Sequence, residues 1–350
     1  MQDKLEKIII LRTTGKINTM LLMPPAHTPP FLSIVFSFRN EEDVLVELIR
    51  RARAAMQASR HKSLVKGHEL IFVNDASNDN SLAILLDQDK GHNDIRVINM
   101  SRTFGVAPCV MAGLAHAQGD AVVYMDADLQ DPPELIGAML ENYLNDPQVD
   151  VVHTLRLNRK GEPAFKLFLT KIGYLVLNRY SSVPIPQEAG DFKLLSRRAV
   201  DYILKFKENK PFLRGIIAWV GFKQNFVPYT REARFAGKSK FFILGRKALS
   251  NFLNAAVVNF SSVPLQIAVY CGLCAIFVDM VFIAHALYQK ISGHALPGWT
   301  ALMIVILSMG GVQLFCLGMI GLYLNSVHEQ TKMRPNYIIS SLYGFPNQNT

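Results

Sequence analysis

The stretch Ala121-Val-Val-Tyr-Met-Asp-Ala-Asp-Leu-Gln-Asp-Pro-Pro-Glu134 joins a short apolar run to a cluster of acids and a Pro-Pro-Glu sequence. Residues 121–125 have the length and composition of a buried strand, and Pro133 suits the first turn of a helix. Asp126 and Asp128 therefore stand just beyond the carboxyl end of a predicted strand. Because similar apolar runs alternate with amphipathic segments before it, we expect an α/β fold with a mostly parallel sheet and helices on both faces.

The segments on the N-terminal side carry this alternation. Strands are predicted at 31–38, 69–73 and 95–99, and helices at 41–58, 80–89 and 106–117. Open sheets of this kind bind their ligands beyond the carboxyl ends of the strands. The residues that follow Phe38, Val73 and Met125 are therefore the predicted location of the chemistry.

The composition excludes several classes of protein. The chain has 350 residues, of which 50% are hydrophobic and 19% charged, and its mean hydropathy is +0.17. That is enough apolar material for a buried core and too much for a disordered or collagen-like chain. Of the four cysteines, Cys271 and Cys274 have CxxC spacing without a second pair or a histidine at ligand spacing. Neither a disulfide framework nor a zinc site is predicted.

Positive charge is concentrated in one part of the chain. The formal net charge is +9, and fourteen Lys and Arg stand against three acids between Lys193 and Lys247, a local excess of +11 that leaves −2 for the rest. A basic block before an apolar segment indicates attraction to anionic lipid head groups or to a phosphorylated ligand. Nucleic acid is not a predicted partner, because zinc-finger spacing and aromatic-basic RNA motifs are absent from the sequence.

Two apolar segments near the C-terminus are long enough to cross a bilayer. One formal charge, Asp279, interrupts the first segment, and none interrupts the second. Flanking Lys and Arg place both chain termini in the cytoplasm by the positive-inside rule, which gives a two-span protein of the inner (plasma) membrane. The predicted organisation is a flexible lead at 1–30, a cytoplasmic catalytic domain at 31–240, an interfacial amphipathic helix at 241–263, spans at 264–289 and 299–324, and a cytoplasmic tail at 325–350.

Acidic residues follow three of the predicted strands. Asp126 and Asp128 are hard oxygen ligands suited to Mg²⁺ or Mn²⁺ that also holds a diphosphate, although an isolated Asp-x-Asp is more often a solvated turn. Asp75 is placed to accept hydrogen bonds from a ribose or a base, and Asp79 to cap the next helix. Glu41 either lines a nucleotide pocket or favours the N-terminus of its own helix.

Together these motifs resemble family 2 glycosyltransferases, and within them the polyprenyl-phosphate glycosyltransferases. The resemblance runs from about residue 31 into the tail. It is carried by Asn40-Glu41-Glu42, Val73-Asn74-Asp75-Ala76-Ser77, Ser101-Arg102-Thr103-Phe104-Gly105, Asp126 to Glu134, Gly190-Asp191-Phe192, Phe212-Leu213-Arg214-Gly215, Trp219-Val220-Gly221-Phe222, Arg231 to Lys240 and Arg334-Pro335-Asn336-Tyr337.

The resemblance implies a GT-A, Rossmann-like fold and inverting transfer of a sugar from a nucleotide sugar, expected to be a UDP-sugar, to polyprenyl (undecaprenyl) phosphate. It also implies a homotetramer. The roles that it implies are nucleotide binding by Glu41, Asp75 and Asp126, metal binding by Asp126, Asp128 and Gln130, catalysis by Asp191 and Asp128, and binding of the lipid phosphate or the departing diphosphate by Arg214, Arg231, Arg234 and Lys240.

A phosphate acceptor changes the role that is expected for Asp191, because it does not require a catalytic base. A phosphate monoester has its second pKa at about 6, so it is largely a dianion at neutral pH and hardly needs a base. Asp191 is therefore expected to orient the acceptor or to stabilise positive charge at the anomeric carbon. The Arg and Lys cluster suits a phosphate acceptor better than a sugar hydroxyl.

Departures from the family pattern leave the donor open. Asn74 stands where the family commonly has a first Asp, Ala76 replaces a usual Gly, and Ser37-Phe38-Arg39 replaces Pro-x-Tyr. Glucose is the first expectation for the sugar, with GDP-mannose or an amino sugar behind it. A processive polysaccharide synthase would need more spans and a Gln-x-x-Arg-Trp motif. A non-catalytic, membrane-anchored scaffold that binds nucleotide sugars is the remaining alternative.

Overall fold

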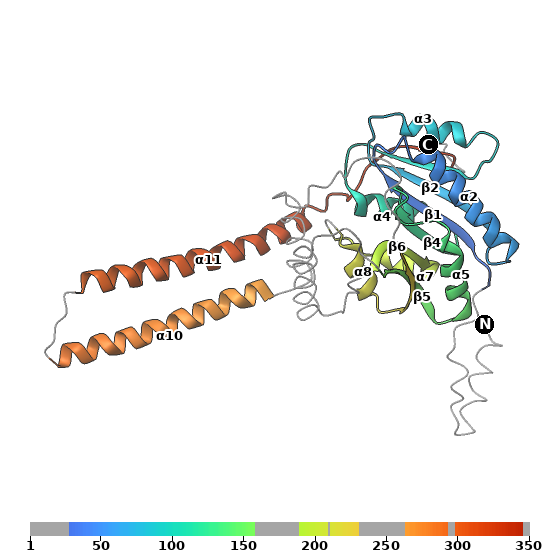
Figure 1. The fold of residues 1–350 in the computed structure, drawn as a ribbon. Coiled ribbons are helices and arrows are strands. Elements are labelled where there is room, and N and C mark those ends of the chain that lie inside the picture. Colours follow the sequence, from blue (N-terminus) through green and yellow to red (C-terminus); the bar gives the residue numbers. More distant parts are fainter. Residues whose placement is uncertain (1–27, 158–188, 209–210, 231–262, 293–297, 346–350) are drawn as a thin grey trace, which may run out of the picture.

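The structure, a computed structural model, describes residues 28–157, 189–208, 211–230, 263–292 and 298–345. Figure 1 shows an α/β body from which a pair of long helices extends. The strands are β1 Phe31–Phe38, β2 Gly67–Asn74, β3 Ile95–Met100, β4 Ala121–Asp126, β5 Val149–Arg156, β6 Ala189–Ser196, β7 Lys223–Tyr229 and β8 Ile339–Tyr343. The helices are α2 Leu45–His61, α3 Ser81–Gln88, α4 Val106–His116, α5 Leu135–Asn145, α7 Arg197–Ile203, α8 Leu213–Trp219, α10 Val263–Ile291 and α11 Trp299–Thr331.

The strands of the described residues form one sheet in the order β7-β5-β6-β4-β1-β2-β3-β8. Four of the seven pairings are parallel, and the three antiparallel ones are β4 with β6, β5 with β6, and β3 with β8. The strands β3, β2, β1 and β4 form the parallel centre. The expectation of a mostly parallel α/β sheet is confirmed.

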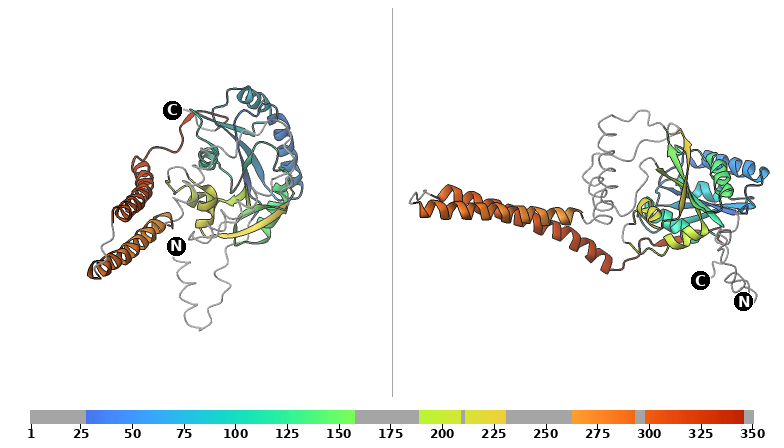
Figure 2. Two further views of the ribbon diagram at one scale, coloured as in Figure 1. Left: turned by 60° about the vertical axis from the view of Figure 1, so that its left-hand side comes forward. Right: turned by 90° about the horizontal axis from the view of Figure 1, so that it is seen from below.

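Hydrophobic side chains on the two faces of this sheet pack in two separate cores. On β1, Leu32, Ile34 and Phe36 join one core and Val35 joins the other, because alternate residues of a strand point to opposite faces. Helices α2, α3 and α5 supply apolar side chains to the first core, and α4, α7 and α8 supply them to the second. Figure 2 shows the sheet between these two helical layers, as the sequence predicted.

The strand order reverses next to β1, and a ligand crevice arises there. Strands β2 and β3 follow on one side of β1, and the chain then returns through α4, on the face opposite to α2, to place β4 on the other side of β1. Strands β1 and β4 are parallel neighbours, with Ser37 beside Asp126 at their carboxyl ends. This is the topological switch point at which open α/β sheets bind ligands.

The predicted elements differ from the observed ones mainly at their ends. The strand predicted at 31–38 has those bounds, but α2 begins at Leu45 instead of 41. The backbone N–H groups of Val44 and Leu45 both donate to the carbonyl of Glu41, so the residues before α2 form a turn. This turn keeps Glu41 at the sheet edge, where the crevice lies.

The tail that was predicted as a separate segment at 325–350 is in part a strand of the sheet. Strand β8 pairs antiparallel with β3, with Leu342 opposite Ile98. Asn336 Nδ2 also donates to the carbonyl of Glu208, at 2.8 Å. The strand has only five residues, of which two are serines, so its sequence carries too weak a β signal to predict it.

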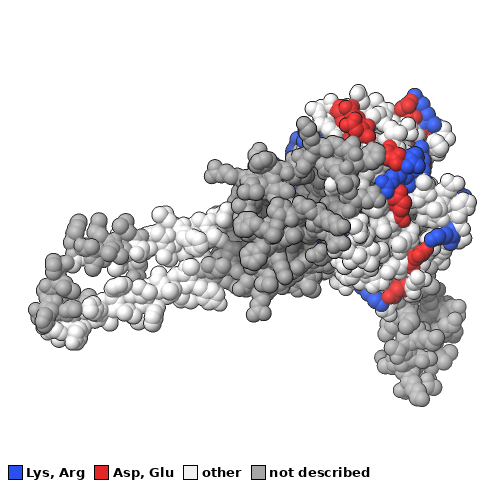
Figure 3. All heavy atoms as spheres, viewed as in Figure 1, with Lys and Arg blue, Asp and Glu red and all other residues white. Residues whose placement is uncertain are grey.

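Helices α10 and α11 lie side by side in every view and are joined by a contact between Cys316 Sγ and the carbonyl of Ala268 at 3.3 Å. Within the described residues, one helical segment is long and apolar enough to cross a membrane: Ser308–Thr331, with a mean hydropathy of 1.4 and none of its apolar window buried. In Figure 3 the described part of this arm shows no charged side chain on the visible face. The helix α10 covers the predicted span 264–289, whose membrane crossing stays a prediction, and residues 241–262 of the predicted interfacial helix lie outside the described residues.

Close packing of α4 on the sheet leads to the first testable prediction. A Cβ atom added at Gly113 would lie 2.2 Å from Val35 Cγ1 and 3.2 Å from Val73 Cγ2. Overpacking of this kind costs about 1–3 kcal/mol, so Gly113→Ala is expected to lower the free energy of unfolding by that amount despite the better helix propensity of alanine. Thermal or denaturant unfolding of the purified variant measures the change.

Gly137 of α5 provides the matched control. A Cβ atom there would meet only Ser59 Oγ at 3.6 Å, an ordinary van der Waals distance. Gly137→Ala is therefore expected to be neutral or stabilising by up to about 1 kcal/mol. Equal behaviour of the two variants would contradict the packing that the structure shows.

Candidate active site

The chain turns sharply beyond β1, β2 and β4. Asn40, Ala76 and Leu129 have φ values of 53°, 52° and 55°. These values lie in the left-handed region of backbone conformation, which residues other than glycine rarely adopt. Backbone in this conformation is concentrated at functional sites, where surrounding contacts maintain it. Ala76, which replaces a usual glycine of the family, thus keeps the glycine-like conformation. Three of the loops at the crevice are held in strained turns.

Hydrogen bonds join the loops after β1 and β2. The backbone N–H of Asn40 donates to Ser77 Oγ at 2.9 Å, and that of Asn78 donates back to Asn40 Oδ1 at 3.0 Å. The N–H of Glu42 reaches Asp79 Oδ2 at 3.3 Å. Asp79 Oδ1 also accepts the N–H of Ser81, the first residue of α3, at 3.1 Å, but the N-cap residue of α3 is Asn80, which makes no side-chain cap bond. Asp79 thus joins the two loops and supports the start of α3 from outside the predicted cap position.

Asp75 holds the loop that leads into α4. Its side chain is nearly buried, and its two carboxylate oxygens accept the backbone N–H groups of Phe104 at 2.7 Å and Gly105 at 3.0 Å. Burial, together with the charge of Asp75, raises the pKa of the neighbouring Cys109 thiol far above its usual value, so this thiol stays protonated. Asp75 thus holds the loop before α4 in place, and it also faces the crevice.

A cavity of about 430 Å³ occupies the crevice, and we call it the carboxylate cavity. It brings together four of the predicted site residues: Glu41, Asp75, Asp126 and Asp128. Its full lining is Ser37, Phe38, Arg39, Glu41, Asp75, Thr103, Gly105, Val106, Cys109, Asp126, Ala127 and Asp128. The exposed side chain of Arg39 was not among the predicted site residues, although its position directly after β1 pointed to it.

The carboxylate cavity fits a divalent cation that is shared with a substrate. Asp126 and Asp128 both line it, and the hydroxyl of Ser37 reaches Asp126 Oδ1 at 3.5 Å. The described residues hold no group of three or more His, Cys, Asp or Glu placed to form a complete cage. Mg²⁺ is commonly bound by one or two carboxylates, waters and substrate phosphates, so two acids at an open cavity suit it. The backbone N–H of Gln130 donates to Asp128 Oδ1 at 3.2 Å, and a metal role for the Gln130 side chain stays a prediction.

A second cavity, of about 230 Å³, adjoins the first and shares Val106 and Asp126 with it. We call it the Asp191 cavity. Its lining comes from β4, β6, α4 and the start of α8: Val106, Ala107, Val110, Tyr124, Asp126, Asp191, Pro211, Phe212, Leu213 and Arg214. Asp126 therefore stands at the junction between a cavity rich in carboxylates and one that contains Asp191 and Arg214.

Asp191 and Arg214 form a two-point ion pair in this cavity. Arg214 Nε donates to Asp191 Oδ1 at 2.8 Å, and Nη2 donates to Oδ2 at 2.6 Å. Burial alone raises the pKa of the Asp191 carboxyl, but the Arg214 hydrogen bonds and charge, with Lys193 and Arg156 nearby, lower it to about 2. The Asp191 side chain is still 36% exposed, so the carboxylate is ionised at neutral pH and accessible to a ligand.

Lys193 lies on the same face of β6 as Asp191 and is only 1% exposed. Its Nζ donates to the carbonyl of Gly190 at 2.6 Å and lies 6.0 Å from the centroid of the Tyr124 ring. Burial lowers the pKa of the ammonium group to about 7, with Asp191 attracting the proton and Arg214 repelling it. Neither Lys193 nor Tyr124 was among the predicted site residues.

Asp131, the third aspartate of the stretch 121–134, has a structural role. Its side chain is 1% exposed, it accepts a hydrogen bond from the Tyr229 hydroxyl, and Arg156 Nη2 lies 3.4 Å from Oδ2. Arg156 Nε also donates to the Tyr229 hydroxyl at 3.0 Å. A Cβ atom at Gly190 would lie 2.9 Å from Arg156 Nη2, so the glycine leaves room for this guanidinium beside the strand. This cluster supports the strand that carries Asp191.

The basic cluster that the sequence predicted is only partly described. Arg214 lies in the Asp191 cavity, whereas Arg231, Arg234 and Lys240 lie outside the described residues. Their contact with a lipid phosphate or a diphosphate stays a prediction.

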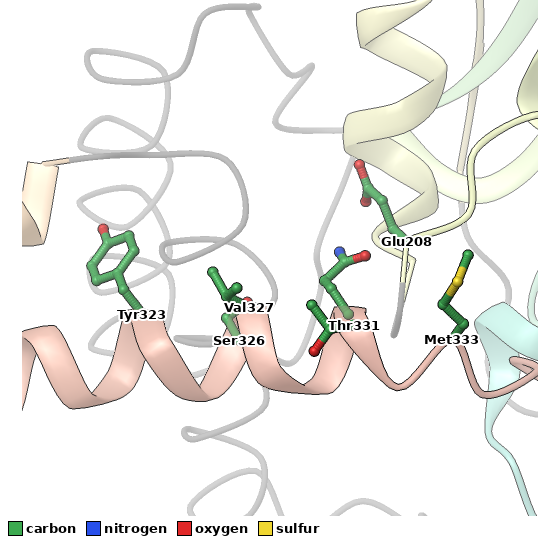
Figure 4. Close-up of a pocket in the computed structure, with 7 residues that line it drawn as sticks. Glu208, Tyr323, Ser326, Val327, Thr331 and Met333 are labelled. Carbon is green, nitrogen blue, oxygen red and sulfur yellow. The ribbon is translucent and has the colours of Figure 1, made fainter.

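A third cavity, of about 630 Å³, lies apart from the other two, between the end of α11 and the segment after α7. In Figure 4, Tyr323, Ser326, Val327 and Thr331 follow one side of α11, and Glu208 lies across from them. Burial raises the pKa of the Glu208 carboxyl. Glu208 is the single acidic or basic side chain of the described lining, so this cavity does not have the charges of the other two.

Comparison with known proteins identifies the family. Residues 33–204 match the model of glycosyl transferase family 2. An uncharacterized glycosyltransferase from Synechocystis sp. is 38% identical over 89% of this chain and 96% of its own length, and one from Bacillus subtilis is 36% identical over 90% and 95%. A prophage bactoprenol glucosyl transferase homolog from Escherichia coli is 33% identical over 88% of this chain and 98% of its own length. This identity over nearly the whole length of each relative, together with the GT-A-like α/β fold and its mostly parallel sheet, shows that the chain belongs to glycosyltransferase family 2.

Proposed function

We propose that this glycosyltransferase transfers glucose from UDP-glucose to polyprenyl phosphate, using Mg²⁺ or Mn²⁺. The observation that carries the proposal is the junction of two cavities at Asp126: one has the carboxylates for a metal and a diphosphate, and the other has Asp191 and Arg214. The Escherichia coli relative is named as a bactoprenol glucosyl transferase homolog, which supports the choice of glucose and of a bactoprenol acceptor.

The carboxylate cavity is the proposed donor site. Asp75 and Glu41 face the nucleoside from the ends of β2 and β1, and Asp126 and Asp128 would hold the metal. A bound Mg²⁺ or Mn²⁺ supplies Lewis-acid stabilisation for the negative charge of the diphosphate. Arg39 adds a side-chain cation to the lining of the same cavity.

The Asp191 cavity is the proposed site of the acceptor phosphate. An oxygen of this phosphate attacks the anomeric carbon on the face opposite the nucleoside diphosphate. The new C–O bond forms as the bond to the diphosphate oxygen breaks, the bonding electron pair leaves with the nucleoside diphosphate, and the configuration inverts. With a pKa of about 2, Asp191 is too weak a base for an obligatory proton transfer and serves instead to orient the acceptor and to stabilise positive charge at the anomeric carbon.

A lipid acceptor requires the catalytic domain to work at a membrane surface. The segment Ser308–Thr331 has the length and hydropathy of a span, and α10 runs beside α11. We propose that both helices cross the inner membrane and that the α/β body and both chain termini lie in the cytoplasm. Nucleotide sugars are then available on the side where the active site lies.

A donor panel tests the proposed function. Purified full-length protein in detergent is given undecaprenyl phosphate, Mg²⁺ or Mn²⁺, and one radiolabelled nucleotide sugar at a time. The expected result is label in the organic phase from UDP-glucose, abolished by a chelator. Lipid labelling from GDP-mannose or from an amino-sugar donor instead would overturn the choice of glucose, and tight binding of UDP without lipid labelling by any donor would favour the non-catalytic scaffold.

A further inference from the structure

Tyr124 carries a buried hydroxyl that the fold does not use. Its side chain is 1% exposed, and within the described part of the chain the hydroxyl has no hydrogen-bond partner. A buried tyrosine hydroxyl normally finds a partner, because leaving one unpaired costs part of the stability of the fold. An unpaired hydroxyl on a residue that lines a cavity therefore needs an explanation, and a bound substrate group provides one.

Tyr124 differs from the other residues with unpaired buried polar atoms in its location. Among the described residues, five buried side-chain atoms have no hydrogen-bond partner, and only that of Tyr124 belongs to a residue that lines either of the two adjoining cavities. Strand β4 places Tyr124 two residues before Asp126, on the same face of the sheet. Its ring is part of the wall of the Asp191 cavity, to which Asp126, Asp191 and Arg214 also contribute.

The surrounding charges indicate what the hydroxyl binds. Lys193 Nζ lies 6.0 Å from the centre of the Tyr124 ring, and Arg214 lines the same cavity as Tyr124. Asp126 and Asp191 line this cavity too, and Arg214 is paired with Asp191. A tyrosine hydroxyl has an ordinary pKa of about 10, so at neutral pH it is protonated and can donate a hydrogen bond. A neutral hydrogen-bond donor beside basic side chains suits an anionic oxygen of a phosphate group, which the two carboxylates repel.

We propose that the Tyr124 hydroxyl donates a hydrogen bond to the phosphate of the lipid acceptor and thereby helps to position its attacking oxygen. This inference rests on the proposed function, since it requires the acceptor phosphate to enter the Asp191 cavity. The donor diphosphate belongs to the carboxylate cavity on the other side of Asp126. The loss of the hydroxyl is therefore expected to weaken acceptor binding and to leave donor binding unchanged.

Tyr124→Phe in the full-length protein tests the proposal, with steady-state kinetics against undecaprenyl phosphate and UDP-glucose and with thermal unfolding. The variant is expected to unfold at the same or a higher temperature than the wild type, because no internal hydrogen bond is lost. The KM for undecaprenyl phosphate is expected to rise about ten- to a hundredfold, as for the loss of a hydrogen bond to a charged group, while the KM for UDP-glucose changes by less than about twofold.

Tyr229→Phe is the matched control for stability, because the Tyr229 hydroxyl does have partners, Asp131 and Arg156. It is expected to lower the unfolding temperature. A fall in the unfolding temperature of Tyr124→Phe, or an unchanged KM for undecaprenyl phosphate, would overturn the proposal. A rise in the KM for UDP-glucose alone would overturn it too and assign the hydroxyl to the donor sugar. Failure of the proposed function is distinct, because the wild type itself would then transfer no sugar to undecaprenyl phosphate.

Discussion

Replacing Asp128 by Asn is expected to lower the rate of transfer to undecaprenyl phosphate by about 10³-fold, the scale on which preorganised electrostatic groups act in catalysis. The side chain lines the carboxylate cavity beside Asp126. The amide has nearly the shape of the carboxylate but no charge, so the divalent cation that we propose at this cavity would lose one of its two anionic ligands. The fold is expected to remain intact, because the hydrogen bond from the Gln130 backbone N–H can go to the amide oxygen.

Two measurements check this prediction. Initial rates with UDP-glucose give the activity, and calorimetric titration of UDP in the presence and absence of Mn²⁺ shows whether the metal-dependent part of UDP affinity is lost. Asp87→Asn is the matched control, since this acid lies on α3 with its side chain 67% exposed and pairs only with Lys90 among the described residues. Retention of more than about a tenth of the wild-type rate by Asp128→Asn, against the expected loss, would contradict a metal role for this acid.

Replacing Lys193 by Met is expected to make the protein more stable and less active at neutral pH. Its ammonium is buried, and burial lowers the pKa of this group to about 7 from the ordinary value of 10.5. A shift of this size corresponds to about 3–5 kcal/mol of destabilisation when the group is charged. Methionine has a similar length and no charge, so Tm is expected to rise by about 5 °C or more.

The pH dependence gives the sign of this effect. The folded pKa lies below the unfolded one, so the unfolded state binds more protons between about pH 7 and pH 10.5, and stability of the wild type rises with pH through that window. The destabilisation is fully present below pH 7. The groups that face Lys193 are Asp191 on its own strand, Tyr124 on β4, His153 on β5, Arg156 at the end of β5 and Arg214 on α8. The stability gain of Lys193→Met is expected to shrink as the pH rises towards 10.5.

The loss of activity follows from the charges at the Asp191 cavity. Without Lys193, Asp126 and Asp191 oppose an incoming phosphate with Arg214 as the nearest described cation. We expect kcat/KM for undecaprenyl phosphate to fall by about tenfold or more, which corresponds to about 1.4 kcal/mol. Lys223→Met is the control: this exposed lysine pairs with Asp146 at 2.6 Å and is expected to change stability by less than about 1 kcal/mol. A Lys193→Met protein that is less stable than the wild type, or equally active, would contradict this account.

Alternation within strands explains how far the site could be predicted from the sequence. Asp126 and Asp128 stood out because acids directly after an apolar run are unusual, and the structure places both at the switch point between β1 and β4. Tyr124 and Lys193 lie two residues from Asp126 and Asp191, so the period of two in a strand puts them on the same face. An aromatic residue in an apolar run and a lysine in a basic block do not stand out as site residues until their burial and their cavity are known.

Pairings between distant segments are the second reason why part of the structure could not be predicted from the sequence. The five residues of β8 form a strand because they meet the free edge of β3, about 240 residues earlier in the chain, and their own sequence favours a strand only weakly. Likewise, Asp75 was predicted to contact a nucleotide, and its hold on the backbone of Phe104 and Gly105 depends on a loop after another strand. Local patterns predicted the strands β1 to β4 and the helices α2 to α4, whereas β5 to β8, α7 and α8 were not predicted. Contacts between distant segments decided the edges of the sheet and the shape of the crevice.

The nature of the acceptor is the most direct test of the whole account. Purified full-length protein receives radiolabelled UDP-glucose and Mg²⁺ with either undecaprenyl phosphate or undecaprenol, which differ only in the phosphate. We expect label in the organic phase with undecaprenyl phosphate and none above background with undecaprenol, because Arg214 offers a phosphate a cation in the Asp191 cavity and a phosphate needs no base, whereas a hydroxyl does. Equal labelling of the two lipids, or labelling of undecaprenol alone, would contradict it.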